Sequence, residues 1–149
     1  MTLLVPYDGT DLSKAALERA SEFASFMDAD VVALTVVPDD ESWFAVDQGW
    51  LGEDEPFDLD AICDRLREEV HAVAPSATFR CETTEDVSEK ATIEMDVVRT
   101  IRNVADEVDA EIVFIGSENA GRVTTPVTSV GAPVSEDPRY DVHIVRHVD

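Results

Sequence analysis

The stretch Ile112-Val113-Phe114-Ile115-Gly116-Ser117-Glu118-Asn119-Ala120-Gly121-Arg122 decides the fold of this chain. Its run of apolar residues is typical of a strand covered on both faces, as in a parallel sheet. Gly116 predicts a sharp backbone turn where that strand ends. In open parallel sheets, ligands bind beyond the carboxyl ends of the strands, where loop amides and helix N-termini attract anions. The stretch therefore predicts a central strand whose end borders a ligand site.

Strand and helix patterns alternate through the rest of the chain. Short apolar or alternating runs predict further strands at residues 3–6, 31–37, 78–83 and 141–148. Apolar residues at helical spacing predict one helix that starts after Thr10 or Asp11 and continues to Met27, and others at 58–74, 93–108 and 127–136. Strands that alternate with helices favour an α/β sandwich with a parallel core.

One junction occurs twice. Asp28-Ala29-Asp30-Val31-Val32 and Asp109-Ala110-Glu111-Ile112-Val113 each join the end of a predicted helix to a predicted strand. The similarity is local and too short to indicate a duplicated domain.

Residues 38–57 form the longest predicted loop, acidic and irregular, with Trp43, Phe44, Trp50 and Leu51 spread through it. Loops of this length are uncommon unless they are functional. Two interpretations are open. Either the aromatic side chains fold back onto the domain, or the segment between Trp43 and Trp50 is a lid or a contact for a protein client.

Length and composition indicate a single domain, residues 1–149, with enough apolar residues for a substantial core. No run approaches the roughly 18 apolar residues of a membrane span, and residues 1–6 lack the basic region of a leader, so we expect a cytoplasmic protein without membrane insertion. In that compartment we expect Cys63 and Cys81 to be unpaired.

The chain carries 33 acidic against 11 basic residues, a formal net charge of −22. Such a surface repels phosphates and disfavours binding to nucleic acid. In molar salt the screening length falls to about 3 Å, so the mutual repulsion becomes tolerable. The composition resembles that of proteins from salt-accumulating halophilic archaea, and we expect a halophilic cytoplasm.

The sequence offers no catalytic or metal-binding pattern. No serine or cysteine lies in a nucleophile motif, and the lysine of a phosphate-binding loop is missing. His143 and His147 are four residues apart on a predicted strand, about 13 Å, too far to share a metal ion. We expect neither catalytic residues nor a metal site.

Several segments together resemble the universal stress protein family over nearly the whole chain. These are Val5-Pro6-Tyr7-Asp8-Gly9-Thr10, the following helix with Ser13, Ala16 and Leu17, Leu34-Thr35-Val36-Val37, and Ile115-Gly116-Ser117. The resemblance implies an adenine nucleotide alpha hydrolase-like fold: a three-layer sandwich with a five-stranded parallel sheet in the order 3-2-1-4-5 and helices on both faces. It also implies that dimers often form through the last strand.

In members that bind ATP, the last loop holds the phosphates with three spaced glycines followed by Ser or Thr. Here Gly116 supplies the first glycine, but Asn119 and Thr128 occupy the positions of the other two. Glu118 adds a carboxylate on this phosphate side, while Ser129 keeps a hydroxyl. The base side is better preserved, because Asp8 matches a residue that meets adenine and Val36 matches one that lines the base. Asp8 has a second interpretation, an Asx turn that caps the first helix.

The resemblance thus implies a nucleotide site formed by Pro6, Tyr7, Asp8, Val36, Ile115, Gly116, Glu118, Asn119, Thr128, Ser129 and Val130. We interpret the chain as a non-enzymatic stress-response or regulatory domain whose adenine-nucleotide site is degenerate. One alternative is a genuine switch that binds ATP or AMP, with Mg, and hydrolyses ATP slowly at most. The other is a regulatory partner of a membrane transporter. We expect a homodimer, since Val142 and Ile144 alternate on an exposed last strand.

Overall fold

The computed structural model describes residues 1–38, 42–84, 93–119 and 139–148. Its strands are all parallel and form one five-stranded sheet in the order β3-β2-β1-β4-β5, which confirms the predicted order. The strands are β1 (Thr2–Pro6), β2 (Asp30–Val37), β3 (Thr78–Thr83), β4 (Ala110–Gly116) and β5 (Asp141–Val145). The helices are α1 (Asp11–Met27), α2 (Ser42–Asp47), α3 (Leu59–Val73) and α4 (Ile93–Glu107). The middle strand is β1, and β4 lies beside it.

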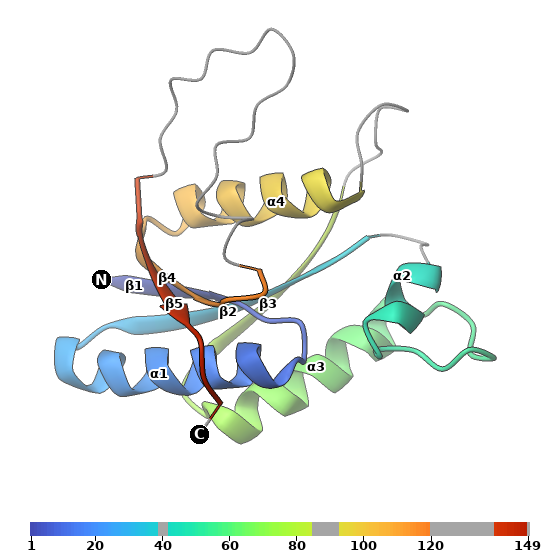
Figure 1. Cartoon of the computed structure of the whole chain (residues 1–149), viewed down its shortest axis with the longest axis horizontal. Coiled ribbons are helices and arrows are strands. Elements are labelled where there is room, and N and C mark those ends of the chain that lie inside the picture. Colours follow the sequence, from blue (N-terminus) through green and yellow to red (C-terminus); the bar gives the residue numbers. More distant parts are fainter. Residues whose placement is uncertain (39–41, 85–92, 120–138, 149) are drawn as a thin grey trace, which may run out of the picture.

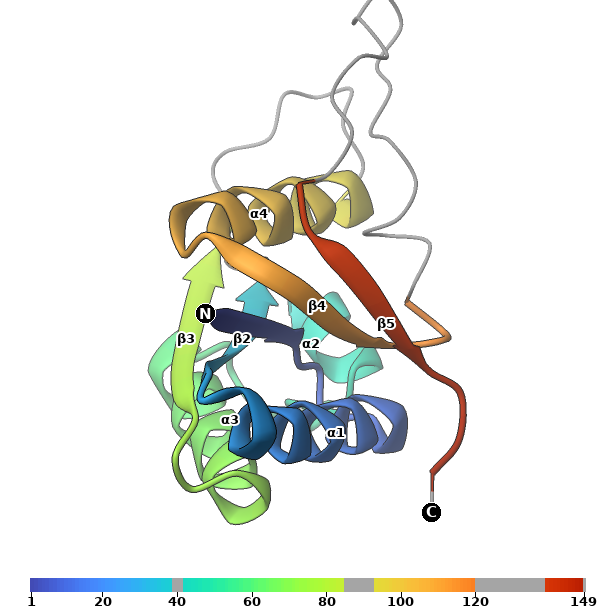
Figure 2. The ribbon, with the colours of Figure 1, turned by 90° about the vertical axis from the view of Figure 1, so that its left-hand side faces the viewer.

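The sheet is the middle of three layers. Helices α1 and α3 cover one face and α4 covers the other, while α2 lies beyond the end of β2 (Figures 1 and 2). Strands β1 and β4 supply a large part of the fully buried core, because helices pack on both of their faces; Leu3, Leu4, Val5, Val113 and Phe114 have no exposed area. The apolar runs in the sequence therefore indicate strands whose two faces are both covered by helices.

The ends of α1 follow directly from its sequence. Thr10 is the N-cap, and its hydroxyl oxygen accepts a hydrogen bond from the Ser13 amide at 3.2 Å. Asp28 ends the helix in the left-handed region, with φ of 51°. Asp109 has φ of 50° before β4. The two similar junctions thus share one backbone conformation, which aspartate tolerates better than most residues.

Gly116 begins the predicted turn, since its carbonyl accepts a hydrogen bond from the Asn119 amide at 3.0 Å, but it does not turn by a left-handed backbone. It belongs to β4, and its φ lies outside the left-handed region that Gly9 and Gly49 adopt. A Cβ at this position would lie 2.8 Å from Leu12 Cβ on α1. Glycine is required here because β4 and the first turn of α1 approach closely.

The segment 38–57 is not wholly irregular, contrary to the prediction. It contains α2, and its aromatic side chains mostly fold back: Phe44 and Trp50 are 8% and 5% exposed, whereas Trp43 is 59% exposed. The sequence conceals this helix because it is short and its last turn is acidic.

The expectation of unpaired cysteines is wrong. Cys63 on α3 and Cys81 on β3 form a disulfide, because α3 packs against the edge strand and brings two residues of distant sequence together. The last strand also ends earlier than predicted, at Val145. The predicted helix 127–136 lies outside the described residues.

Within the described ranges, none of the helices has the length and apolar character that a membrane span requires. In the same part of the chain, His, Cys, Asp and Glu side chains nowhere gather in the group of three that would hold a metal ion.

Candidate functional site

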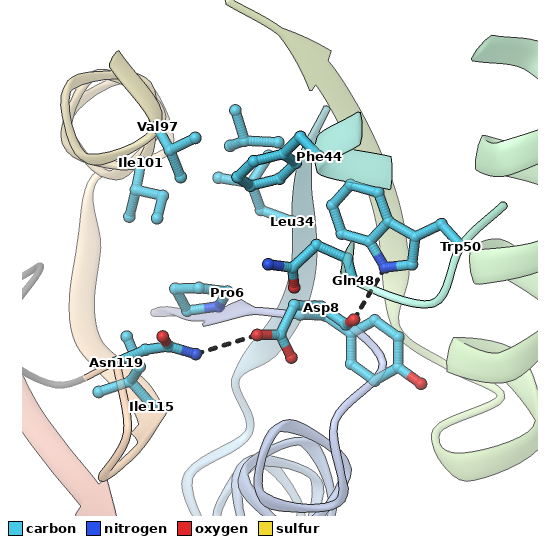
Figure 3. A pocket seen from close by; sticks show the side chains of 12 residues that line it. Pro6, Asp8, Leu34, Phe44, Gln48, Trp50, Val97, Ile101, Ile115 and Asn119 are labelled. Carbon is cyan, nitrogen blue, oxygen red and sulfur yellow. Dashed lines mark hydrogen bonds between the residues drawn. The ribbon is translucent and has the colours of Figure 1, made fainter. Parts of the chain in front are cut away.

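A pocket lies beyond the carboxyl ends of β1, β2 and β4 (Figure 3). This is where open parallel sheets bind ligands. Six of the predicted site residues line it: Pro6, Tyr7, Asp8, Val36, Ile115 and Asn119. The three strand ends therefore bring together residues that are more than 100 positions apart in the sequence.

The other predicted site residues lie elsewhere. Gly116 packs against Leu12 and does not line the pocket, and Glu118 is exposed in the turn that follows β4. The predicted positions Thr128, Ser129 and Val130 lie outside the described residues. The described pocket is therefore the base side of the predicted site, and the roles of these five residues remain predictions.

The Asp8 carboxylate is held by three hydrogen bonds. Its Oδ1 accepts from the Thr10 amide at 3.0 Å and from the Thr10 hydroxyl at 2.6 Å, and its Oδ2 accepts from Asn119 Nδ2 at 3.0 Å. Asp8 thus forms an Asx turn, although Thr10 rather than Asp8 caps α1. A carboxylate oxygen accepts about two hydrogen bonds, so Oδ1 is saturated while Oδ2 keeps one acceptor position.

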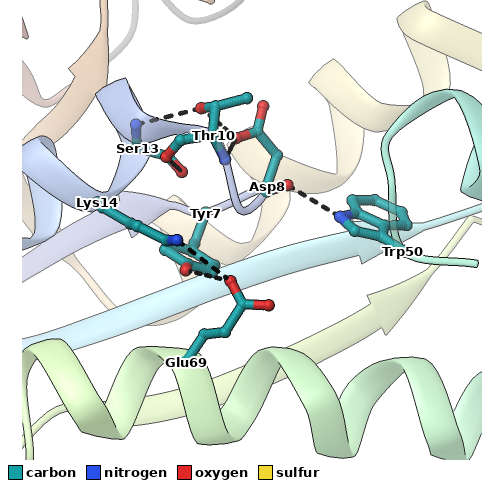
Figure 4. A network of polar contacts seen from close by, with 7 residues as sticks. All are labelled: Tyr7, Asp8, Thr10, Ser13, Lys14, Trp50 and Glu69. Atoms are coloured by element: carbon teal, nitrogen blue, oxygen red, sulfur yellow. Dashed lines mark hydrogen bonds and ion pairs between the residues drawn. The ribbon is translucent and has the colours of Figure 1, made fainter.

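Trp50 fixes the same loop from the other side. Its indole Nε1 donates to the Asp8 carbonyl oxygen at 2.9 Å (Figures 3 and 4), and its own carbonyl accepts from Arg65 at 2.7 Å. Phe44 packs edge-on against Trp50, with ring centroids 5.8 Å apart. The segment after β2 is therefore joined to the loop that carries Asp8.

Tyr7 faces away from Asp8, toward α1 and α3 (Figure 4). Its hydroxyl donates to Glu69 Oε1 at 2.8 Å, and Lys14 Nζ lies 3.9 Å from the same oxygen. Burial raises the pKa of the Tyr7 hydroxyl, and the hydrogen bond to Glu69 raises it further. Tyr7 therefore stays protonated and acts as a donor that anchors the pocket floor to α3.

Sequence reasoning missed six residues that also line the pocket: Leu34, Phe44, Gln48, Trp50, Val97 and Ile101. For Val97 and Ile101 the signal was present, because both lie on the apolar stripe predicted for α4. For Phe44 and Trp50 the sequence offers two interpretations, packing onto the domain or contact with a client. Gln48 carried no signal at all, since a single glutamine in an acidic segment is ordinarily solvated.

The described lining is mostly apolar and contains no lysine, arginine or histidine. Its only ionisable groups are the Asp8 carboxylate, which already makes three hydrogen bonds, and the Tyr7 hydroxyl. Such a pocket suits a flat, apolar ring with a few polar atoms.

Comparisons with known proteins agree with this arrangement. Residues 1–146 match the sequence model of the universal stress protein family. A universal stress protein solved in complex with cAMP is 25% identical, with a TM-score of 0.54 over 100% of this chain and 98% of that chain. A member from Burkholderia pseudomallei is 18% identical, with a TM-score of 0.60 over 98% and 96% of the two chains. UspA from Lactobacillus plantarum is 19% identical, with a TM-score of 0.55 over 98% and 97%.

These solved structures share the adenine nucleotide alpha hydrolase-like fold. Among curated proteins, no significant match is found.

Proposed function

Because the chain belongs to the universal stress protein family, we propose that it is a non-enzymatic regulatory domain that binds an adenine nucleotide in the pocket beyond β1, β2 and β4. One observation carries the proposal: the pocket combines apolar walls with an oriented acceptor, Asp8 Oδ2. A similar chain binds cAMP, which supports an adenine ligand for this fold.

We propose that the phosphate side of the site is weakened. Asn119 stands where the family motif has a glycine, and its amide is used to hold Asp8. Glu118 adds negative charge, and the described lining contains no lysine or arginine that could neutralise the charge of a phosphate. Each further phosphate therefore adds repulsion without a matching cation from the described lining, so AMP or cAMP is expected to bind at least as tightly as ATP.

The absence of enzymatic activity is also part of the proposal. General acid–base catalysis requires a group whose proton is exchangeable near neutral pH. In the described lining, the Asp8 carboxylate lies on the base side of the proposed site, where its remaining acceptor position faces the ligand, and burial keeps Tyr7 protonated. Neither residue is suited to activate a water molecule for ATP hydrolysis.

Titration calorimetry in molar KCl tests this function, with AMP, cAMP, and ATP plus magnesium as separate titrants. We expect saturable heat with AMP or cAMP. The absence of heat with all three at millimolar concentration refutes nucleotide binding. If magnesium-ATP binds clearly more tightly than AMP, the degenerate site is refuted and the ATP switch takes its place.

We also propose that the chain forms a homodimer through β5. Strand β5 pairs only with β4, so no described strand covers its other edge, and Val142 and Ile144 on β5 are half-buried. An open strand edge favours pairing with a second copy. Light scattering in molar KCl is expected to give the mass of a dimer; a monomer at micromolar concentration excludes this interface.

We propose further that the protein works in a high-salt cytoplasm. With 33 acidic and 11 basic residues, at least 22 acidic groups (33 − 11) lack a cation to pair with one to one. Added salt screens their repulsion, so the melting temperature is expected to rise between dilute buffer and molar KCl. Higher stability in the dilute buffer contradicts the proposal.

A client that binds the segment from Trp43 to Trp50, such as a membrane transporter, also remains a proposal. Trp43 is the exposed large side chain of that segment. If a partner captured with the intact chain is also captured with a Trp43→Ala variant, this surface is not its docking site.

A further inference from the structure

The short helix α2 ends in a geometry that fixes the residue after it. The Trp50 amide donates to the Ala45 carbonyl at 2.9 Å, and the Gly49 amide donates to the Val46 carbonyl at 3.0 Å. Gly49 has φ of 80°. Together these features are a Schellman motif, with Gln48 as the C-cap and Gly49 in the left-handed position that follows it.

Two tertiary contacts place this motif over the pocket. Trp50, the residue after the glycine, packs on Phe44 with ring centroids 5.8 Å apart and donates to the Asp8 carbonyl. Because its carbonyl is also bonded to Arg65 of α3, the motif is tied to both the site loop and a core helix. The Gln48 backbone is therefore fixed relative to Asp8.

The side chain of Gln48 points into the pocket, on the side of Asp8 and Pro6 (Figure 3). Its carboxamide makes no hydrogen bond to any residue in the described part of the chain, although its backbone amide donates to the Phe44 carbonyl. The Trp50 indole donates to the Asp8 carbonyl, and the Asn119 amide donates to the Asp8 carboxylate. Gln48 is thus the pocket side chain whose whole carboxamide is available, whereas the carboxamide of Asn119 is already fixed by its bond to Asp8 Oδ2.

A carboxamide presents a donor and an acceptor side by side. Adenine presents the complementary pair, its 6-amino donor beside a ring-nitrogen acceptor, and glutamine binds this pair with two hydrogen bonds in nucleic-acid recognition. The walls formed by Leu34, Phe44 and Ile101 are apolar and suit a planar ring.

We propose that Gln48 is a specificity-determining residue that reads the 6-amino edge of an adenine base. This inference rests on the proposed function, since it specifies how the base is recognised in that pocket. It assigns a role to the segment after β2: the segment supplies one wall of the base site and the polar group that distinguishes the base.

The test compares two ligands on two proteins by calorimetry in molar KCl. The ligands are AMP and purine riboside 5′-monophosphate, which lacks only the 6-amino group. The intact chain is expected to prefer AMP. A Gln48→Leu variant is expected to lose at least about fivefold of that preference, the lower limit for one bidentate base contact. Gln48→Met, closer in shape, gives the same loss if the polar group is responsible.

Asp47→Ala is the matched control, because Asp47 is the adjacent exposed residue of α2 and does not line the pocket. It should leave the AMP preference unchanged. If both Gln48 variants lower the affinity for the two ligands equally, or change neither affinity, Gln48 does not distinguish the base. The proposed function then still stands. If the intact chain binds neither ligand, the proposed function itself fails and the inference with it.

Discussion

Replacement of Gly116 by alanine tests the close approach of β4 and α1. The added Cβ would lie 2.8 Å from Leu12 Cβ and 3.4 Å from the Leu12 carbonyl carbon. Carbon atoms prefer separations of about 3.5–4.0 Å, so the first contact is too short by roughly 1 Å. Leu12 Cβ is attached directly to the backbone of α1, and no rotamer change moves it away.

The strand and the helix must therefore separate, or their contact must remain strained. Inserting one methyl group into a packed site of this kind costs about 1–3 kcal/mol. Urea unfolding in molar KCl, followed by circular dichroism, measures this cost as a lower midpoint at unchanged slope.

Gly52→Ala is the matched control. Its added Cβ would also come within 2.8 Å of another atom, but that atom is Glu55 Oε1, the far end of an exposed and flexible side chain. We expect a change below about 0.5 kcal/mol, as for surface substitutions generally. If Gly116→Ala costs no more than Gly52→Ala, the close packing of β4 on α1 is not what requires glycine.

Three further predictions concern stability. Asp28→Gly is expected to stabilise the fold by about 1 kcal/mol and Asp28→Ala to destabilise it, because φ of 51° strains residues with a Cβ; equal urea midpoints for both variants would contradict this. Burial, and secondarily the positive charge of Arg19, lowers the pKa of His143 below 6.5. His143 therefore binds its proton at a higher pH in the unfolded chain than in the folded one, so stability falls as the pH drops through 6.5. His143→Gln should make the free energy of unfolding less dependent on pH in this range. Reduction of the disulfide between Cys63 and Cys81, which are 18 positions apart, should lower the free energy of unfolding by about 3 kcal/mol, because the unfolded chain regains loop entropy. An unchanged urea midpoint in dithiothreitol would refute this.

The sheet was predictable because burial on both faces leaves a direct trace in sequence. The apolar runs around Val31 and Ile112 locate β2 and β4. The edge strand β3 is only partly buried, and residues 78–83 were predicted from their alternating pattern instead. The strand order came from the family resemblance, since periodicity alone does not order parallel strands.

The contacts made between elements were not predictable. The reason for a glycine at position 116 was not predictable, because a glycine serves equally for a positive φ or for close packing, and only the position of Leu12 decides between them. The pairing of Cys63 with Cys81 depends on α3 lying against β3. For α2, the pattern from Trp43 to Gly49 was a helix followed by a C-terminal glycine, but its acidic surroundings concealed it.

The two sides of the proposed site differ in what a ligand meets. On the base side, hydrogen bonds from Thr10, Asn119 and Trp50 orient Asp8, so binding there needs little further ordering. On the phosphate side, a ligand approaches a chain of net charge −22. If repulsion is what disfavours additional phosphates, the preference for AMP over ATP should be large in dilute buffer and shrink in molar KCl, where the screening length is about 3 Å. A preference that does not change with salt would assign it to the shape of the loop after β4 and not to charge.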